Sequence, residues 1–339
     1  MTGPLVLSRE QVLAHRRRVG ALDGRLPSGA DSVRRAAWAG LTDSVPRAAL
    51  LSLHARVEGT APSAWLDPPL VQLWGPRFST YAVASQDQAV FSLGRRSAGT
   101  SRRRLAEDLA ERLENLLGDQ EMPYGQAGRA LGVHPNQLRY AATTGRVLIR
   151  WDGARQPVVR MAPVPTTSAE DARLELARRY LRVLGPGTAD GFGRWAGLYA
   201  RAAGPAFESL RPELTPVRTE AGDAWVLTED EPDLRTTAGP TAPARLLPSG
   251  DAYYLLWGRD RELLVPETGR RAELWTSRVW PGAVLVRGEV VGTWRRAEEV
   301  VLVSLWGPLP PAGREAVERE ALSLPVPRLK KPVRLQWQG

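Results

Sequence analysis

The residue types that most often build metal sites and covalent intermediates are scarce in this sequence. It has no cysteine, which excludes disulfides, thiolate zinc sites and cysteine nucleophiles. Its histidines are His15, His54 and His134, and no two of them have the spacing of a paired metal ligand. We therefore expect no metal and no cofactor, and we expect His54 to be packed or exposed on a helix rather than to act as a general base.

Arginine supplies almost all of the positive charge. The net charge is +9, and all but two of the 46 basic residues are arginine. The planar guanidinium group can donate two parallel hydrogen bonds to a phosphate or to the edge of a base. Arginines occur in runs at 16–18, 34–35, 95–96 and 102–104, and the C-terminal tail holds Arg328, Lys330, Lys331 and Arg334. Any single run can be a solvated helix face, but several runs on one basic chain favour a polyanionic partner, with nucleic acid ahead of a membrane surface.

Length and hydropathy indicate a globular protein with more than one domain. The 339 residues are enough for two or three domains, and 43% of them are hydrophobic. No run of about 18 apolar residues predicts a membrane helix, and the N-terminus shows no secretory signal. We expect a cytoplasmic, nucleoid-associated protein.

The N-terminal third predicts helices followed by a hairpin. Ser8 is a plausible N-cap for the first helix, and Pro46 suits the first turn of the third. The predicted elements are helices over 8–19, 30–40 and 45–57 and strands over 70–74 and 78–84. Helices followed by a two-stranded wing are typical of a winged-helix domain.

The same plan returns twice along the chain. The second round has a helix over 102–119, a helix–turn–helix around Gly132, and strands over 147–151 and 156–162; the third has helices over 168–185 and 185–198 and a hairpin over 215–230. The second helix of a helix–turn–helix normally enters the major groove of DNA. Here it would present Asn136, Gln137, Arg139 and Tyr140 to the bases, and the alternative is that these side chains face water.

The pattern changes after a predicted linker at 236–244. Short apolar segments separated by glycine turns follow up to Gly307, which suits a small antiparallel β-barrel, and a helix over 313–323 precedes the basic tail. The expected fold is α+β, with three tandem winged-helix domains followed by a small antiparallel β-barrel domain. The expected units are 1–93, 94–165, 166–235, the barrel at 245–312, and the C-terminal helix and basic tail at 313–339.

Several segments resemble one known family along nearly the whole chain. They are GLTDSVPRAALLSLHARVEG (40–59), WGPRFSTYAVAS (74–85), GPGTADGFGRWAGL (185–198), RLLPSGDAYYLLWGRDRELLVPE (245–267) and PGAVLVRGEVVGTWRR (281–296). All are similar to segments of the AlkZ-like bacterial DNA glycosylases. The resemblance implies winged helices that wrap duplex DNA and an enzyme that excises N-alkylated purines or unhooks crosslinks between them.

The sequence departs from the family at three positions of interest. The family's catalytic segment carries two glutamines separated by one residue, and the matching positions are Thr42 and Ser44, with Asp43 between them. Where the family often has Arg-Gly-Thr-x-His in the following wing, this chain runs from Arg77 to Tyr81 as RFSTY. The family's Phe-Asp pair in the C-terminal unit is Gly250–Asp251 here.

An N-alkylated purine is already a cationic leaving group, so its excision mainly requires a held water and a stabilised sugar cation. The hydroxyls of Thr42 and Ser44 can position water, and the carboxylate of Asp43 can deprotonate it. In an extended segment, Thr42 and Ser44 share a face while Asp43 points the other way. The alternative is structural: Ser44 is a natural N-cap for the next helix, and Asp43 or Thr42 would favour the positive end of that helix.

The remaining candidates each have two interpretations. Arg77 contacts a phosphate or is a solvated loop residue, and Tyr81 stacks on a base or packs in the core of its hairpin. Trp38, Trp65 and Trp74 are expected in the core rather than as DNA wedges. Three functions stay open: an active glycosylase, a silent relative that binds damaged duplex, and a sequence-specific regulator. The regulator is least favoured, because no dimerisation element is visible, and we expect a monomer.

Overall fold

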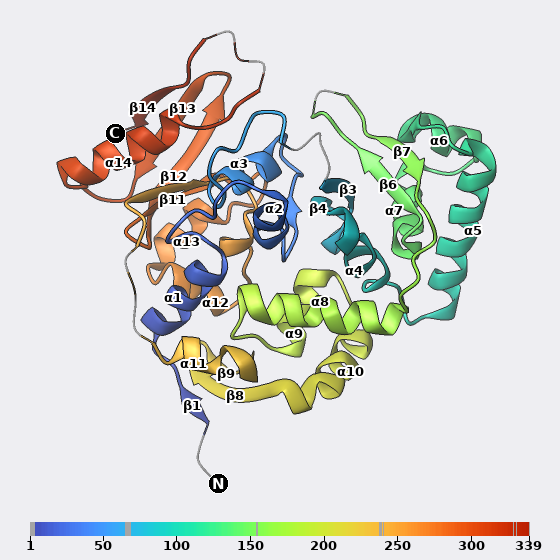
Figure 1. Cartoon of the computed structure of the whole chain (residues 1–339), viewed down its shortest axis with the longest axis horizontal. Coiled ribbons are helices and arrows are strands. Elements are labelled where there is room, and N and C mark those ends of the chain that lie inside the picture. The colour runs from blue at the N-terminus through green and yellow to red at the C-terminus, as the bar shows by residue number, and fades with distance from the viewer. Residues whose placement is uncertain are drawn as a thin grey trace.

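The computed structural model of the protein describes residues 4–64, 69–153, 155–236, 239, 241–327, 329 and 331–338. The predictions for Trp65, Arg328 and Lys330, and for part of the linker at 236–244, fall outside these residues. The fold is mixed α+β with three sheets, which confirms the predicted class (Figure 1). Within the described ranges, no helix is long and apolar enough to cross a membrane.

The N-terminal elements follow the sequence pattern, with one shift. They are β1 (Leu5–Val6), α1 (Arg9–Val19), α2 (Ala30–Ala36), β2 (Leu41–Thr42) and α3 (Ala48–His54). Ser8 caps α1 as predicted, in a reciprocal pair with Gln11. Helix α3 begins three residues later than expected, because Arg47 takes a left-handed φ of 69° and the helix starts only after it.

The first two predicted hairpins join into a single six-stranded sheet. Its strands are β2, β3 (Leu70–Trp74), β4 (Thr80–Ala84), β5 (Met122–Pro123), β6 (Val147–Arg150) and β7 (Val158–Met161), in the order β2-β4-β3-β6-β7-β5. The hairpins were predicted, but their union was not. It is made through the pairing of Gln72 in β3 with Ile149 in β6.

Helices pack around this sheet and separate the two hairpins in sequence. They are α4 (Gln88–Leu93), α5 (Thr100–Leu117), α6 (Tyr124–Ala130) and α7 (Leu138–Ala141), with 3-10 turns at Pro76–Phe78 and Pro135–Gln137. The predicted amphipathic face of α5 is confirmed, since Leu109, Leu113 and Leu117 are buried. Its N-cap is Gly99, so the helix begins two residues before the predicted start at 102.

The third round lies at the bottom of Figure 1 and includes the start of the chain. Its elements are α8 (Ala169–Leu184), α9 (Ala189–Ala196), α10 (Ala200–Leu210), β8 (Leu214–Thr219), β9 (Gly222–Leu227) and α11 (Glu231–Leu234). Strand β1 pairs in parallel with β8, so residues near the N-terminus complete the sheet of a hairpin more than 200 residues away.

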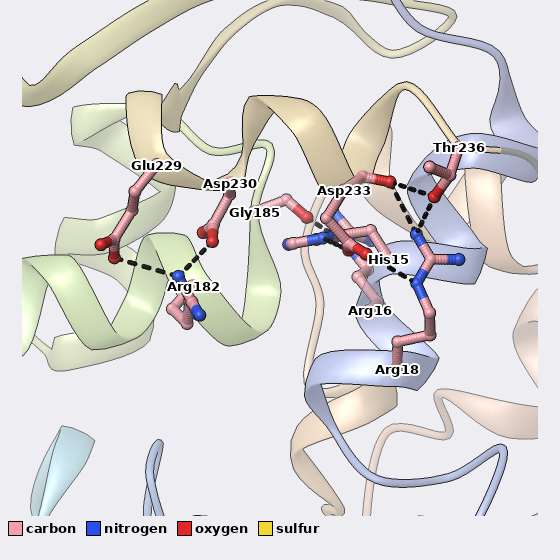
Figure 2. Close-up of polar contacts among 9 residues, drawn as sticks. All are labelled: His15, Arg16, Arg18, Arg182, Gly185, Glu229, Asp230, Asp233 and Thr236. Atoms are coloured by element: carbon pink, nitrogen blue, oxygen red, sulfur yellow. Dashed lines mark hydrogen bonds and ion pairs between the residues drawn. The ribbon is translucent and has the colours of Figure 1, made fainter.

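Many of the arginines in the predicted runs form ion pairs and hydrogen bonds within the fold. Figure 2 shows Arg18 and His15 of α1 both reaching Asp233 of α11, with His15 Nδ1 2.7 Å from a carboxylate oxygen. Arg16 is buried and donates to the carbonyl of Gly185. Arg182 of α8 pairs with Glu229 and Asp230 in the same view. The run at 16–18 is therefore neither a solvated face nor an open anion site.

The C-terminal unit is an open five-stranded sheet, so the described residues do not form the predicted small antiparallel β-barrel. Its strands are β10 (Ala244–Leu247), β11 (Gly282–Val286), β12 (Glu289–Ala297), β13 (Val300–Leu305) and β14 (Arg334–Gln338), with α14 (Pro311–Leu322) against them. Strand β14, formed by the basic tail, runs parallel to β13 at one edge. Two of the short apolar segments predicted as strands, 253–258 and 262–266, instead overlap a 3-10 turn (Ala252–Tyr254) and α12 (Asp260–Leu264), and α13 (Thr268–Leu274) follows. Short apolar runs do not distinguish strands from buried helical turns.

Candidate functional site

The three candidate residues at 42–44 leave the sheet at the end of β2. Thr42 pairs with Tyr81 of β4, and the amide of Asp43 donates to the carbonyl of Thr80. The side chains of Thr42 and Asp43 are buried, and Ser44 is exposed. Asp43 and Ser44 thus point to opposite sides, as the extended pattern predicted, but Thr42 does not share the open face with Ser44.

Asp43 stabilises the start of α3. One carboxylate oxygen accepts from the amide of Ala49 at 3.1 Å, the other from Nε2 of Gln72 at 2.7 Å, and Arg47 lies 3.7 Å away. Burial raises the pKa of Asp43 to about 7, against the lowering effect of these partners. The prediction that Ser44 caps the helix is wrong. The N-cap is Arg47, whose left-handed backbone delays the helix and leaves Ser44 outside it, and the Asp43 carboxylate accepts from an amide of the first turn.

Gln72 connects this segment to the second hairpin. While its Nε2 donates to Asp43, its Oε1 accepts from the backbone amide of Trp151 at 2.6 Å. The same tryptophan's carbonyl accepts from Arg47. Sequence reasoning missed Gln72, although a glutamine in the middle of the apolar strand LVQLW is a signal, because a buried amide needs polar partners.

Thr42 is held by the C-terminal unit. Its hydroxyl donates to the carbonyl of Gly250 at 2.8 Å. The next residue, Asp251, has a fully buried side chain that accepts from both terminal nitrogens of Arg56, at 2.7 Å each, and from Ser52 at 2.6 Å. Ser52 lies in α3, and Arg56 lies just after it. The Gly250–Asp251 pair therefore fixes both ends of the segment that carries the candidate triplet.

Ser44 opens into a hollow of about 390 Å³. Arg77 and Phe78 at the tip of the first wing, Arg139 of α7, and Trp151 at the end of β6 also line it. We call this the serine hollow. Three residues that the sequence singled out from separate segments, Ser44, Arg77 and Arg139, therefore meet there. A hollow lined by a hydroxyl and two arginines can hold a water and attract an anion such as a phosphate.

Two features of the serine hollow point to a function. Arg77 and Phe78 both adopt left-handed backbone angles, with φ of 54° and 58°, and such strain in non-glycine residues concentrates at functional sites. The Nε–H of Arg139 is buried and has no hydrogen-bond partner among the described residues. Arg77 is stacked over Trp257 of the C-terminal unit at 4.5 Å, which fixes its direction.

Other predicted site residues lie elsewhere. Tyr81 is wholly buried beneath Gly40 and Gly75, and burial raises its pKa to about 12, so its ring is not available to stack on a base. Asn136 and Gln137 are exposed on the turn before α7 but do not line the serine hollow. Tyr81 therefore packs in the core of its hairpin, as one of the two interpretations expected. The contact of Asn136 and Gln137 with DNA stays a prediction.

The aromatic and histidine predictions are largely confirmed. Trp74 is buried, and Trp38 is half-buried between Arg34 and Arg179. His54 is packed, with Nε2 3.0 Å from the hydroxyl of Ser323, and burial together with Arg25 lowers its pKa to about 4. It is positioned as a structural contact to the C-terminal helix.

The comparisons with known proteins identify the family. A family model described as "DNA glycosylase AlkZ-like" matches residues 33–324. The chain belongs to this AlkZ-like family. An interstrand DNA cross-link repair glycosylase of Streptomyces sahachiroi is 34% identical over 160 residues, which span 45% of this chain and 42% of that protein. The match thus covers less than half of that relative's length.

A solved structure extends the likeness to the whole fold. The DNA glycosylase AlkZ of Streptomyces sahachiroi superposes with a TM-score of 0.80 at 20% identity, covering 98% of this chain and 100% of that one. At this identity the likeness concerns the fold. It shows that the arrangement of elements around the serine hollow is that of an AlkZ-like protein.

Proposed function

We propose that this protein binds duplex DNA and acts as a monofunctional DNA glycosylase on N-alkylated purines or on crosslinks between them. The observation that carries the proposal is that Ser44 shares one hollow with two arginines from different rounds of the fold, Arg77 and Arg139. Membership of the AlkZ-like family supports the reaction class. The relative from Streptomyces sahachiroi, whose name specifies interstrand cross-link repair, supports the substrate class.

The three residues of the triplet would have different roles in the reaction. A cationic alkylated base leaves readily, so the protein must hold the attacking water and stabilise the sugar cation. Ser44 is the member of the triplet that opens into the hollow, and its hydroxyl would orient that water. Thr42 and Asp43 act as positioning residues: Thr42 is tied to Gly250, and Asp43 to the start of α3. Arg77 and Arg139 would hold the phosphates that flank the lesion.

The finer architecture belongs to the same proposal. Residues 1–93, 94–165 and 166–235 would each serve as a winged-helix unit that contacts the duplex, with α7 and the preceding turn, including Asn136 and Gln137, in the major groove. The open sheet at 245–312 and the helix and strand at 313–339 would support the first unit. The partner would be duplex DNA and the protein a monomer.

A second function is favoured by one observation. The hydroxyl of Thr42 and the carboxylate of Asp43 are both buried and both engaged in hydrogen bonds, so neither reaches the hollow. A relative that recognises damaged duplex without cleaving it would tolerate this arrangement. The two functions differ in whether a base is released, not in whether DNA is bound.

A base-release assay tests both. Wild-type protein is expected to release 7-methylguanine or to unhook a purine crosslink in duplex DNA. Ser44→Ala is expected to reduce the single-turnover rate about 10²-fold without changing the affinity, and the Thr42→Ala/Asp43→Ala/Ser44→Ala triple variant to abolish release. Ser63→Ala, at an exposed serine outside the hollow, is the matched control. Tight binding with no released base on either substrate would establish the silent relative instead.

The arginine contribution is tested by salt dependence. Arg139→Ala is expected to weaken duplex binding about tenfold and to reduce the slope of log affinity against log salt by about one. The reason is that Arg139 lines the serine hollow and that its buried Nε–H has no partner among the described residues. Arg319→Ala in α14 removes the same charge from an exposed site outside the hollow and should leave the slope unchanged. An equal effect of the two variants would mean that net charge alone drives binding.

A further inference from the structure

A second hollow adjoins the serine hollow, and Phe78 lines both. It is formed where the tip of the first wing, helices α5 and α7, and the link between α9 and α10 come together. Its floor is apolar, with Ala106, Leu198 and Ala202, and its volume is about 70 Å³. The rings of Phe78, Tyr140 and Tyr199 line it as well. We call it the aromatic hollow.

Two of these rings are unusually open to solvent. Tyr199 is 56% exposed and Tyr140 is 40% exposed, whereas most large aromatic side chains of this protein are packed. Tyr140 stands edge-on to Phe78, with ring centres 5.3 Å apart. Beneath them, the guanidinium of Arg95 is stacked on Phe78 at 4.6 Å and is held by the carbonyls of Ala196 and Trp74. The rings therefore rest on a fixed base.

Positive charge surrounds the exposed ring of Tyr199. Arg102 donates to its hydroxyl at 2.6 Å and lies over the ring at 4.8 Å, and Arg201 lies over the ring at 5.5 Å. Both arginines line the hollow. A tyrosine ring already flanked by guanidinium groups offers a flat apolar face and two phosphate ligands at the same point.

Two of the three arginines that open α5 make no side-chain hydrogen bond or ion pair within the described fold. Arg102, Arg103 and Arg104 are exposed in the first turn, which holds no acidic residue, so they oppose the positive end of the helix dipole. Among the described residues, Arg103 and Arg104 have no side-chain partner. The other runs differ: Arg17 binds Asp23, Arg34 binds Asp87, and Arg95 is buried. The run beside the aromatic hollow therefore offers Arg103 and Arg104 to an anion, in addition to the Arg102 that already contacts Tyr199.

We infer that the aromatic hollow holds one unstacked nucleotide of the bound DNA, an inference that rests on the proposed function. The base would stack on Tyr199 and place its edge toward Tyr140 and Phe78, while Arg102 and Arg201 bind the flanking phosphate. Stacking on an aromatic ring recognises any base through its flat face, and arginine adds to it. The volume fits the edge of a planar ring and excludes a whole nucleoside, so the sugar stays on the rim.

Fluorescence of 2-aminopurine tests this inference. One duplex carries a single unpaired 2-aminopurine, and a second carries the same base fully paired. Wild-type protein is expected to bind the bulged duplex about tenfold more tightly and to quench its fluorescence. Tyr199→Ser is expected to lose both the preference and the quenching, and Tyr199→Phe to retain them, because the ring and not the hydroxyl is used. Leu322→Ser, at a site 52% exposed on α14, should behave as wild type.

The outcomes separate the inference from the proposed function. Equal affinity for the two duplexes, or an unchanged preference in Tyr199→Ser, overturns the inference, and base release in the same preparations leaves the proposed function standing. Selective binding of the bulged duplex without any base release supports the inference and rejects the glycosylase. If wild-type protein binds neither duplex, both are wrong.

Discussion

Replacing Arg56 with methionine is expected to lower the free energy of unfolding by about 3–5 kcal/mol. The substitution leaves the carboxylate of Asp251 wholly buried with no countercharge, having lost two hydrogen bonds of 2.7 Å. Ser52 and the amide of Tyr253 would remain as its partners, and neither carries a charge. Because Gly250 holds Thr42, the same change should disturb the serine hollow.

Denaturant unfolding measures this effect, and a double variant provides its control. Arg56→Met/Asp251→Leu removes both charges and should recover a large part of the lost stability, since a buried ion pair is most costly when only half of it is present. If the single variant is no less stable than the double one, loss of the countercharge to Asp251 does not destabilise the fold.

The contribution of Asp43 to the stability of the protein is expected to fall as the pH rises from about 4 to about 7. Burial raises the pKa of Asp43 from 3.8 to about 7 in the folded state, so the folded protein binds this proton more tightly than the unfolded chain does. The stabilisation is fully present below the unfolded pKa of 3.8 and is lost as the pH rises through the folded pKa of about 7. At ~1.4 kcal/mol per pKa unit, the change is on the order of 4 kcal/mol.

Asp43→Asn isolates this contribution. The amide oxygen can accept from either Ala49 or Gln72 but not from both, so the variant should lose stability, and its residue 43 no longer contributes to the pH dependence. Burial raises the pKa of Asp230 to about 6 and lowers that of His54 to about 4. Both groups titrate in both proteins, so their effects cancel in the difference. The two stability curves, measured by chemical denaturation across this range, should converge as the pH rises. Parallel curves would show that Asp43 is ionised throughout.

Local features of the fold were predictable, and long-range ones were not. Ser8, Ser168 and Thr188 cap helices that the sequence predicts, because a capping side chain needs only its own neighbours. The pairing of Gln72 with Ile149 and of β1 with β8 joins segments far apart in the chain, and no local pattern encodes it. Two apolar runs of the C-terminal unit were predicted as strands for the same reason. Whether a short apolar run forms a strand or a helical turn depends on the segments that pack against it, not on the run itself.

The candidate site divides in the same way. Ser44, Arg77 and Arg139 were identified from residue type and position, and they do line one hollow. Tyr81 was included because wing aromatics can stack on bases, but Gly40 and Gly75 leave space in which its ring is buried. The burial of Asp43 could not be predicted either, since it depends on an amide from the next hairpin and on a helix that starts later than Pro46 suggests.

The shared sheet has a mechanical consequence. Gln72 joins the first two hairpins by a strand pairing and by side-chain bonds to Asp43 and Trp151, all of them buried or half-buried. The wing tip that carries Arg77 and the helix that carries Arg139 therefore keep a set spacing before any ligand arrives. A binding site whose two sides keep a fixed spacing cannot adjust its width to fit partners of different shapes. Discrimination between intact and damaged DNA must then come from the free energy needed to bend or open the duplex so that it enters the site. Damage that makes the double helix easier to deform lowers this free energy.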